Sequence, residues 1–245
     1  MQITILGDGA LGRAIANAAR ERGDDIRVVG RPTGGRHDPV DLEGADVTVE
    51  ASRPDAVATN VAAAIDAGCR RLVIATTGWA ADRELVNGLL TGAAATAVAA
   101  SNFSLGVALF GRLVDRAVEL YGRVDAFEPY LVEWHRRAKL DRPSGTALDL
   151  ATRVVAGHPR LTGPDDLEVV AVRAGSSPGM HLLGFDAPGE TLELRLTARD
   201  RSAYAAGVLA SADWLVRAAR PVGLHPFDPI VDELLARDAI AAHAA

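Results

Sequence analysis

A short apolar strand that leads directly into closely spaced glycines opens the chain. Residues 2–6 form this strand, and an alanine-rich segment over 13–22 is typical of a helix. In such a strand–turn–helix unit the first glycine allows a tight turn, the second lets a pyrophosphate approach the backbone, and the third lets the helix pack on the strand. The pattern predicts a dinucleotide-binding turn, with a tight turn that binds nothing as the alternative. The residues predicted to bind the cofactor here are Gly7, Gly9, Ala10, Leu11 and Gly12.

The alternation of strand and helix continues through the first part of the chain. Apolar runs of strand length occupy 26–29, 47–50, 72–75 and 95–99, and a helical pattern spans 54–67. Repeated units of this kind predict an α/β fold with a doubly wound parallel sheet of the Rossmann type. Such sheets bind ligands at the carboxyl ends of their strands. The residues at two of these ends, predicted to border the nicotinamide, are Ala75, Thr76, Thr77, Ser101, Asn102 and Phe103.

The second predicted strand ends at Gly30 and Arg31, where a site that prefers NAD usually carries an acidic residue. A guanidinium matches the geometry of a 2′-phosphate, whereas a carboxylate does not. Arg31, with Arg36 and His37 a few residues on, therefore favours NADPH as the cofactor. Surface arginines are common in loops, so NADH stays open as the alternative.

Composition limits the classes of protein to which this chain can belong. With 245 residues, 49% of them hydrophobic, it can bury one large core or two modest ones. The formal net charge of −6 argues against a general nucleic-acid binder, which needs a basic face. Cys69 is the only cysteine, so we expect it to fill core space and expect neither a disulfide nor a metal site. No apolar run has the length of a membrane span and the first strand begins too early for a signal peptide, which predicts a soluble, cytoplasmic protein.

Strands dominate the second part of the chain. After a long amphipathic helix over 104–121, four segments have strand character, and one helix over 145–156 lies among them. The pattern predicts an inserted α+β domain with a mixed sheet. One helix cannot cover both faces of such a sheet, so we expect the exposed face to pack against another subunit. The strands are predicted at 126–133, 167–173, 181–186 and 191–198.

The order of elements predicts two domains. Helical segments over 203–219 and from Pro229 onward are expected to return to the first domain. Residues 1–103 together with 203–245 would then form the dinucleotide-binding Rossmann domain. Residues 104–202 would form the substrate-binding and oligomerisation domain.

The segment 133–147 brings cations, hydroxyls and a predicted helix start together. Residues 144–146 follow a proline and open a new helix, with Thr146 and Asp149 spaced as a capping box. Unpaired amides at a helix N-terminus bind carboxylate or phosphate. His135 and Lys139 can supply protons or positive charge beside them. The segment is interpreted as a binding site for a small dianion. The alternative is an ordinary capped helix after a basic loop.

Several motifs follow one another along almost the whole chain. They are the glycine turn, the segments 73–78, 102–107, 133–147 and 172–175, the pair Pro178-Gly179 with His181, and Arg201 before Tyr204-Ala205. On these motifs the chain resembles the dihydrodipicolinate reductase (4-hydroxy-tetrahydrodipicolinate reductase) family of bacterial lysine and diaminopimelate biosynthesis.

The resemblance implies a Rossmann domain completed by the C-terminal helices and a substrate domain whose open sheet builds a homotetramer. It implies an oxidoreductase in which a hydroxylated ring loses water and NADPH or NADH delivers a hydride to the resulting cyclic imine, giving tetrahydrodipicolinate. His135 would be the acid or base and Lys139 a proton donor near the imine. The resemblance further implies substrate contacts from Arg136, Ser144, Gly145 and Thr146, and a cofactor contact from Arg201.

The chain departs from the family pattern in four places. Arg136 stands where a second histidine is usual, Ala75 where glycine is usual, and Trp134 where small residues are frequent, while 194–198 lacks a histidine common there. These departures favour a second hypothesis, a reductase of the same build that acts on another cyclic imine or unsaturated acid in specialised metabolism. A catalytically idle NADP-binding protein is the third, and the pairing of His135 with Lys139 argues against it.

Overall fold

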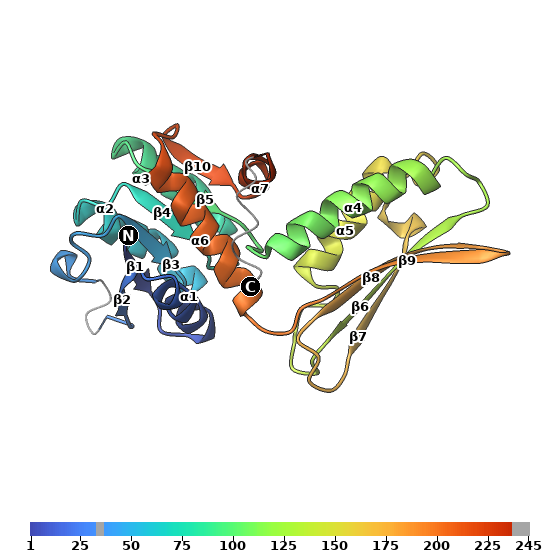
Figure 1. Cartoon of the computed structure of the whole chain (residues 1–245), viewed down its shortest axis with the longest axis horizontal. Helices are drawn as coiled ribbons and strands as arrows, with labels where there is room; N and C mark the ends of the chain where they lie inside the picture. Colours follow the sequence, from blue (N-terminus) through green and yellow to red (C-terminus); the bar gives the residue numbers. More distant parts are fainter. Residues whose placement is uncertain (33–36, 237–245) are drawn as a thin grey trace. The chain divides into compact units, whose positions relative to one another are not determined.

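The structure of the chain is a computed structural model that describes residues 1–32 and 37–236. The chain divides into two compact units (Figure 1), one of Met1–Leu105 with the segment that begins at Arg201, and one of Gly106–Asp200. No helix in the described part of the chain is both long and apolar enough to cross a bilayer. The roles predicted for residues 1–103 with 203–245 and for residues 104–202 stay predictions.

Parallel strands in the order β10-β5-β4-β3-β1-β2 form the sheet of the first unit. The order reverses between β1 and β3, which creates the switch point at which open α/β sheets bind ligands. The predicted doubly wound parallel sheet is therefore confirmed. Its strands are β1 (Gln2–Leu6), β2 (Asp25–Val29), β3 (Val47–Glu50), β4 (Arg71–Ile74), β5 (Thr96–Ala99) and β10 (Gly223–Pro226), and β10 lies outside the strands predicted from sequence.

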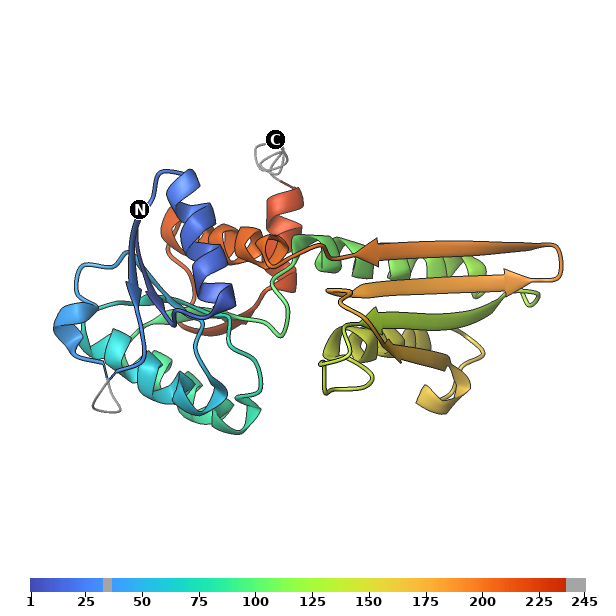
Figure 2. The same cartoon turned by 90° about the horizontal axis from the view of Figure 1, so that it is seen from below.

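Helices cover both faces of this sheet (Figure 2). α1 and α6 pack together on one face, and α2 and α3 lie on the other. Leu72 and Ile74 of β4 pack against Val86 and Leu90 of α3, and Cys69 fills space in the same core, as predicted. The helices are α1 (Ala10–Glu21), α2 (Val57–Asp66), α3 (Arg83–Gly92), α6 (Ser202–Arg217) and α7 (Asp228–Leu235), with short 3₁₀ turns at Pro39–Asp41, Pro54–Ala56 and Ala80–Asp82.

A mixed sheet in the order β7-β6-β8-β9 forms the second unit, as predicted. β6 runs parallel to β7, whereas the β6–β8 and β8–β9 pairs are antiparallel. The expectation of one covering helix is wrong, because α4 packs beside α5 on the same face and contributes Phe110 and Val114 to the core around Leu150 and Leu183. The elements are α4 (Leu105–Tyr121), β6 (Glu128–His135), α5 (Gly145–Gly157), a 3₁₀ turn (Pro164–Asp166), β7 (Glu168–Arg173), β8 (Met180–Ala187) and β9 (Glu190–Thr197).

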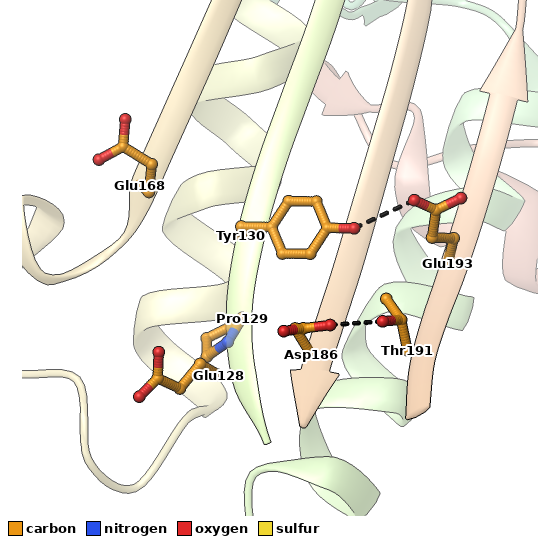
Figure 3. Close-up of a pocket in the computed structure, with 7 residues that line it drawn as sticks. All are labelled: Glu128, Pro129, Tyr130, Glu168, Asp186, Thr191 and Glu193. Carbon is orange, nitrogen blue, oxygen red and sulfur yellow. Dashed lines mark hydrogen bonds between the residues drawn. The ribbon is translucent and has the colours of Figure 1, made fainter. Parts of the chain in front are cut away.

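The opposite face of the mixed sheet is polar at one end. The Tyr130 ring lies across Gly184, where a Cβ would come within 2.1 Å of the ring, and its hydroxyl donates to Glu193 Oε1 at 3.0 Å. Figure 3 shows the pocket of about 710 Å³ around this tyrosine. Its other lining residues are Glu128, Pro129, Glu168, Asp186 and Thr191. None of the predicted site residues lines it.

Candidate active site

The covered face of the mixed sheet changes from apolar to polar along its length. Leu131, Glu133 and His135 alternate on β6, so all three point to the face that α4 and α5 cover. The strand register pairs Glu133 with His181 on β8 and His135 with Arg173 on β7. Two histidines, a glutamate and an arginine thus meet at one end of the core, where α5 begins.

Glu133 is the hub of this cluster. Its carboxylate is fully buried, and Oε1 accepts the backbone N–H of Ser144 at 2.9 Å and Nη2 of Arg173 at 2.6 Å. Burial works against ionisation, but the hydrogen bonds from Ser144 and Arg173 outweigh it and lower the pKa of Glu133. The second oxygen, Oε2, lies 3.0 Å from Nδ1 of His135 and 3.7 Å from Nε2 of His181.

Both histidines of the cluster are buried and favour the neutral form. Burial lowers the pKa of His181 to about 4, with a smaller contribution from His135. Burial also lowers the pKa of His135, where the attraction of Glu133 is outweighed and Lys139 adds to the lowering. Their rings meet edge to face with centroids 5.2 Å apart. His135 therefore favours the neutral form although its Nδ1 lies 3.0 Å from a carboxylate oxygen.

The pKa of His181 makes the free energy of unfolding depend on pH. The unfolded chain takes up this proton near the ordinary value of 6.5, whereas the folded chain does so only near 4. The contribution of His181 is therefore fully present above pH 6.5 and is lost as the pH falls toward 4, a change of about 3 kcal/mol. Denaturant unfolding of the wild type should lose stability over this window more steeply than His181→Gln. Equal slopes would contradict the assignment.

Gly179 makes room for the catalytic histidine predicted from sequence. This glycine has φ +156°, and a Cβ placed on it would lie 3.0 Å from Nε2 of His135. A side chain here would push on the imidazole. The Pro178-Gly179 motif thus has a structural reason beside the turn it makes.

Lys139 stands next to the cluster in an ion pair that the sequence analysis did not foresee. Its Nζ lies 2.7 Å from Oδ1 and 2.8 Å from Oδ2 of Asp141. Burial opposes the charge on Asp141, but the Lys139 ammonium overrides it and lowers the pKa of this carboxyl. The loop is anchored because Arg136 N–H donates to Ser177 O and Arg137 N–H to Gly175 O. The Arg136 side chain is exposed and has no partner in the described part of the chain, so it can meet a substrate anion.

The predicted helix start is present, but with a different cap. Helix α5 begins at Gly145 with Ser144 as its N-cap, whose Oγ accepts Ala147 N–H at 3.2 Å. The capping box predicted for Thr146 and Asp149 is wrong, since Thr146 already lies inside the helix and Asp149 accepts from Arg153 instead. The Ser144 amide is used by Glu133, and its Oγ also lies 3.2 Å from Nε2 of His181. Ser144 therefore joins the helix start to the histidine cluster.

The glycine turn of the first unit has the form that a nucleotide requires. Gly7 has φ +118°, and a Cβ on it would lie 2.4 Å from Ala51 O. A Cβ on Gly12 would lie 2.0 Å from Gly7 O, so neither position accepts a side chain. A Cβ on Gly9 would meet nothing within 4 Å, which leaves open space over the turn before α1. Helix α1 begins at Ala10, earlier than predicted, so Ala10 and Leu11 form its first turn.

The end of β2 carries the predicted Arg31 and an acid that the sequence analysis missed. Arg31 is exposed, and its charge adds slightly to the hydrogen bond from Arg53 that lowers the pKa of Asp55. Asp8 Oδ2 lies 3.7 Å from the position of a Cβ on Gly30, so a carboxylate from the glycine turn reaches this edge. His37 is buried and burial lowers its pKa, and its predicted place beside a 2′-phosphate stays a prediction. Arg36 lies outside the described residues.

The predicted nicotinamide-facing loops differ in exposure. Ala75 and Thr76 are buried, and Ala75 N–H donates to Glu50 O at 2.7 Å, whereas Thr77 is exposed. Phe103 is buried against Phe227, with ring centroids 5.1 Å apart, so only its backbone can face a ligand. Three further predicted residues lie at loop positions: Ser101 and Arg201 are exposed, and Asn102 Oδ1 accepts Ser104 N–H at 2.8 Å.

The structure adds residues that sequence reasoning left without a role. Glu133, Arg173 and His181 belong to the cluster, and strand alternation with strand register was the signal that could have found them. Trp134, by contrast, points to the opposite face of β6, where its indole N–H donates to Ala174 O. The Trp134 side chain therefore does not alter the cluster on the covered face, and Trp134 does not support the hypothesis of a different substrate.

Known proteins match the chain in both sequence and fold. The sequence profile described as Dihydrodipicolinate reductase, N-terminus matches residues 1–103, and Dihydrodipicolinate reductase, C-terminus matches residues 106–226. A 4-hydroxy-tetrahydrodipicolinate reductase of Halorhodospira halophila is 33% identical over 90% of this chain and 79% of its own length. One from Christiangramia forsetii is 30% identical over 88% of this chain and 92% of its own.

A solved structure supports the fold independently. It is a dipicolinate-bound dihydrodipicolinate reductase from Paenisporosarcina sp. TG-14, with a TM-score of 0.72 and 18% identity over 92% of this chain and 97% of that one. The profiles cover both units and the relatives span most of the chain. The chain belongs to the dihydrodipicolinate reductase family.

Proposed function

We propose that the chain catalyses the NAD(P)H-dependent reduction of 4-hydroxy-tetrahydrodipicolinate to tetrahydrodipicolinate, as its relatives are named to do. As a member of this family it is an oxidoreductase that uses a nicotinamide cofactor. The observation that carries the proposal is the cluster at the start of α5. There His135, whose Nδ1 lies 3.0 Å from the Glu133 carboxylate, the Lys139–Asp141 pair and the first turn of α5 lie within one short stretch of sequence.

Each group in the cluster has a distinct part in this chemistry. The open space over Gly9 fits a dinucleotide, and the reduced nicotinamide supplies the hydride when it is bound. We propose that Gly145 and Thr146 hold a ring carboxylate at the positive end of α5, with Ser144 and Arg136 beside them. Electrons move to the ring nitrogen as the hydride arrives, so the Lys139 ammonium stabilises the transition state more than the ground state. His135 takes or gives the proton.

Asp141 occupies the partner position that a substrate carboxylate would take at Lys139. We propose that a dianion bound here draws the ammonium away from Asp141 and toward the ring. This exchange gives the ion pair a role that a solvated surface lysine would not have.

The preferred cofactor is proposed to be NADPH, through Arg31. A charge-assisted contact to the 2′-phosphate contributes roughly 1.5–3 kcal/mol, so Arg31→Ala should raise the KM for NADPH by about tenfold or more and leave that for NADH nearly unchanged. Asp8→Asn should act in the opposite direction and favour NADPH, because it removes a carboxylate near Gly30. Initial rates measured with each cofactor give the KM values of the two variants for NADPH and NADH. Equal losses for NADPH and NADH in Arg31→Ala would remove the case for a phosphate contact.

A second substrate stays open because of Arg136. Its permanent charge and planar group replace an imidazole at the proposed substrate position, which suits another anionic cyclic imine. The cluster does not support the hypothesis of a catalytically inactive NADP-binding protein, because NADP binding alone does not require a histidine and a paired lysine at this position.

The chain is also proposed to form a homotetramer in the cytoplasm. The proposed assembly uses the face of the mixed sheet opposite α4 and α5, where Val170 and Trp134 are exposed beside polar side chains. The cytoplasmic location follows from the need for reduced nicotinamide. Light scattering of the purified protein tests the assembly.

A spectrophotometric assay tests the reaction. The protein is mixed with NADPH and freshly prepared 4-hydroxy-tetrahydrodipicolinate, and the absorbance of the reduced cofactor is followed. Turnover that pyridine-2,6-dicarboxylate inhibits competitively is the expected result. Turnover on another cyclic imine with none on this substrate would replace the proposal by the second candidate.

A further inference from the structure

Three buried side chains at the polar end of the covered face direct metal-ligating atoms at one another. Oε2 of Glu133 lies 3.0 Å from Nδ1 of His135 and 3.7 Å from Nε2 of His181, and one ligand atom from each of the three residues lies within 4.8 Å of the others. Glu133 and His135 are two residues apart on β6, and His181 is the cross-strand partner of Glu133 on β8. The sheet backbone therefore sets the geometry of the three atoms in advance.

Two of these atoms make no hydrogen bond in the described part of the chain. Among the residues that the structure describes, Glu133 Oε2 and His135 Nδ1 are buried and make no hydrogen bond. Glu133 is 0% and His135 7% exposed, and buried polar atoms in folded proteins nearly always have a partner. The other carboxylate oxygen is held by Ser144 N–H and Arg173, so Glu133 cannot turn away. A cation placed between Oε2 and Nδ1 would satisfy both atoms at once.

We propose that Glu133, His135 and His181 form a binding site for a divalent transition-metal ion of the zinc type. Two imidazoles and one carboxylate are a ligand set typical of zinc, whose bonds of about 2.0–2.1 Å place neighbouring tetrahedral ligands about 3.3 Å apart. The separations of 3.0 and 3.7 Å lie on either side of this value. Magnesium and calcium, which take oxygen ligands, do not fit the set. The expectation of no metal considered only cysteine and so did not weigh these residues.

Two neighbours limit the affinity of this site. The Arg173 guanidinium on Oε1 adds positive charge close to the ion. His181 Nε2 lies 3.2 Å from Ser144 Oγ and must give up that contact to bind a metal. Both effects weaken binding, so we expect a dissociation constant in the micromolar range and a reversible site.

A metal here would inhibit the enzyme, a consequence that rests on the proposed function. The ion on His135 Nδ1 withdraws electron density from the ring, so the remaining ring nitrogen becomes a weaker base toward the substrate. Inhibition by Zn²⁺ should therefore be relieved by a chelator.

Cobalt tests the site without any assay of turnover. Chelator-treated protein is titrated with Co²⁺, which gives intense visible absorption bands when its coordination is tetrahedral, and Zn²⁺ is then added. One ion per chain with bands that Zn²⁺ displaces and Mg²⁺ does not is the expected result. Absence of the bands, or displacement by Mg²⁺, would overturn the site.

Variants and a second measurement locate the ion. His181→Ala and His135→Ala should lose the cobalt bands, while the matched control His225→Ala, in the other unit, should keep them. Bands that persist in both site variants would overturn the assignment. If a site variant fails to fold by circular dichroism, X-ray absorption of the zinc-loaded wild type decides, because two imidazole ligands are expected and a sulfur ligand or an all-oxygen shell contradicts the site.

The two proposals fail separately. Chelated protein that reduces the substrate but gives no cobalt bands disproves the metal site alone. Cobalt bands in a protein that turns over no cyclic imine disprove the reductase function and leave the site standing.

Discussion

Lys139→Ala is expected to lower kcat/KM by about 1,000-fold while cofactor binding stays unchanged. The ammonium is the proposed cation at the ring nitrogen, so its loss removes the charge that stabilises the transition state. The variant leaves Asp141 without its partner at an exposed position, where a lost ion pair costs little stability. Steady-state rates and NADPH fluorescence titration measure the two halves of this prediction.

Arg137→Ala is the matched control for Lys139→Ala. Arg137 is an exposed cation on the same loop, so its loss lowers local charge without touching the proposed machinery. Near-normal rates are expected for this control. A Lys139→Ala enzyme that also kept near-normal rates would show that the ammonium does not act on the ring.

Glu133→Gln is expected to lower the free energy of unfolding by roughly 3 kcal/mol or more, because a buried charge pair loses one partner. The carboxylate is fully buried, and the Arg173 side chain that it neutralises is only 8% exposed. Glutamine keeps an acceptor for the Ser144 amide but leaves the guanidinium uncompensated. Urea unfolding followed by circular dichroism measures the loss.

The pH dependence of this variant has a defined sign. Because the folded pKa of Glu133 is lowered, its contribution is present above the ordinary carboxyl pKa of 4.5 and is lost as the pH falls through the folded value. The difference in the free energy of unfolding between the wild type and Glu133→Gln should therefore become smaller at acid pH. Glu128→Gln changes an exposed residue on the same strand. Its free energy of unfolding should lie within about 0.5 kcal/mol of the wild-type value. A Glu133→Gln protein as stable as this control would contradict the stabilising role assigned to Glu133 in the cluster.

Local patterns are sufficient to predict most of the fold. The glycine turn, the apolar runs and the strands at 168–173 and 190–197 lie where propensity and period place them, because each is specified by its own residues. β10 differs, since Gly223–Pro226 is short and becomes a strand only by pairing with β5. A local sequence pattern does not predict long-range strand pairing of this kind.

The candidate site is only partly visible in the sequence for the same reason. His135 and Lys139 stand out because they lie in one dense basic run. The partners that set their chemistry come from β7, β8 and the start of α5, so the link from Glu133 to Arg173 and His181 requires the sheet register. Asp8 likewise reaches Gly30 only once β1 and β2 lie side by side.

A crystal structure with NADPH and pyridine-2,6-dicarboxylate shows whether the cluster binds a ring dianion beside the nicotinamide. We expect a carboxylate of the inhibitor at the first turn of α5, with Lys139 moved from Asp141 to the ring nitrogen and His135 beside the ring, all next to the hydride-bearing carbon. An inhibitor seated elsewhere, or a nicotinamide carbon remote from Lys139 and His135, would contradict it.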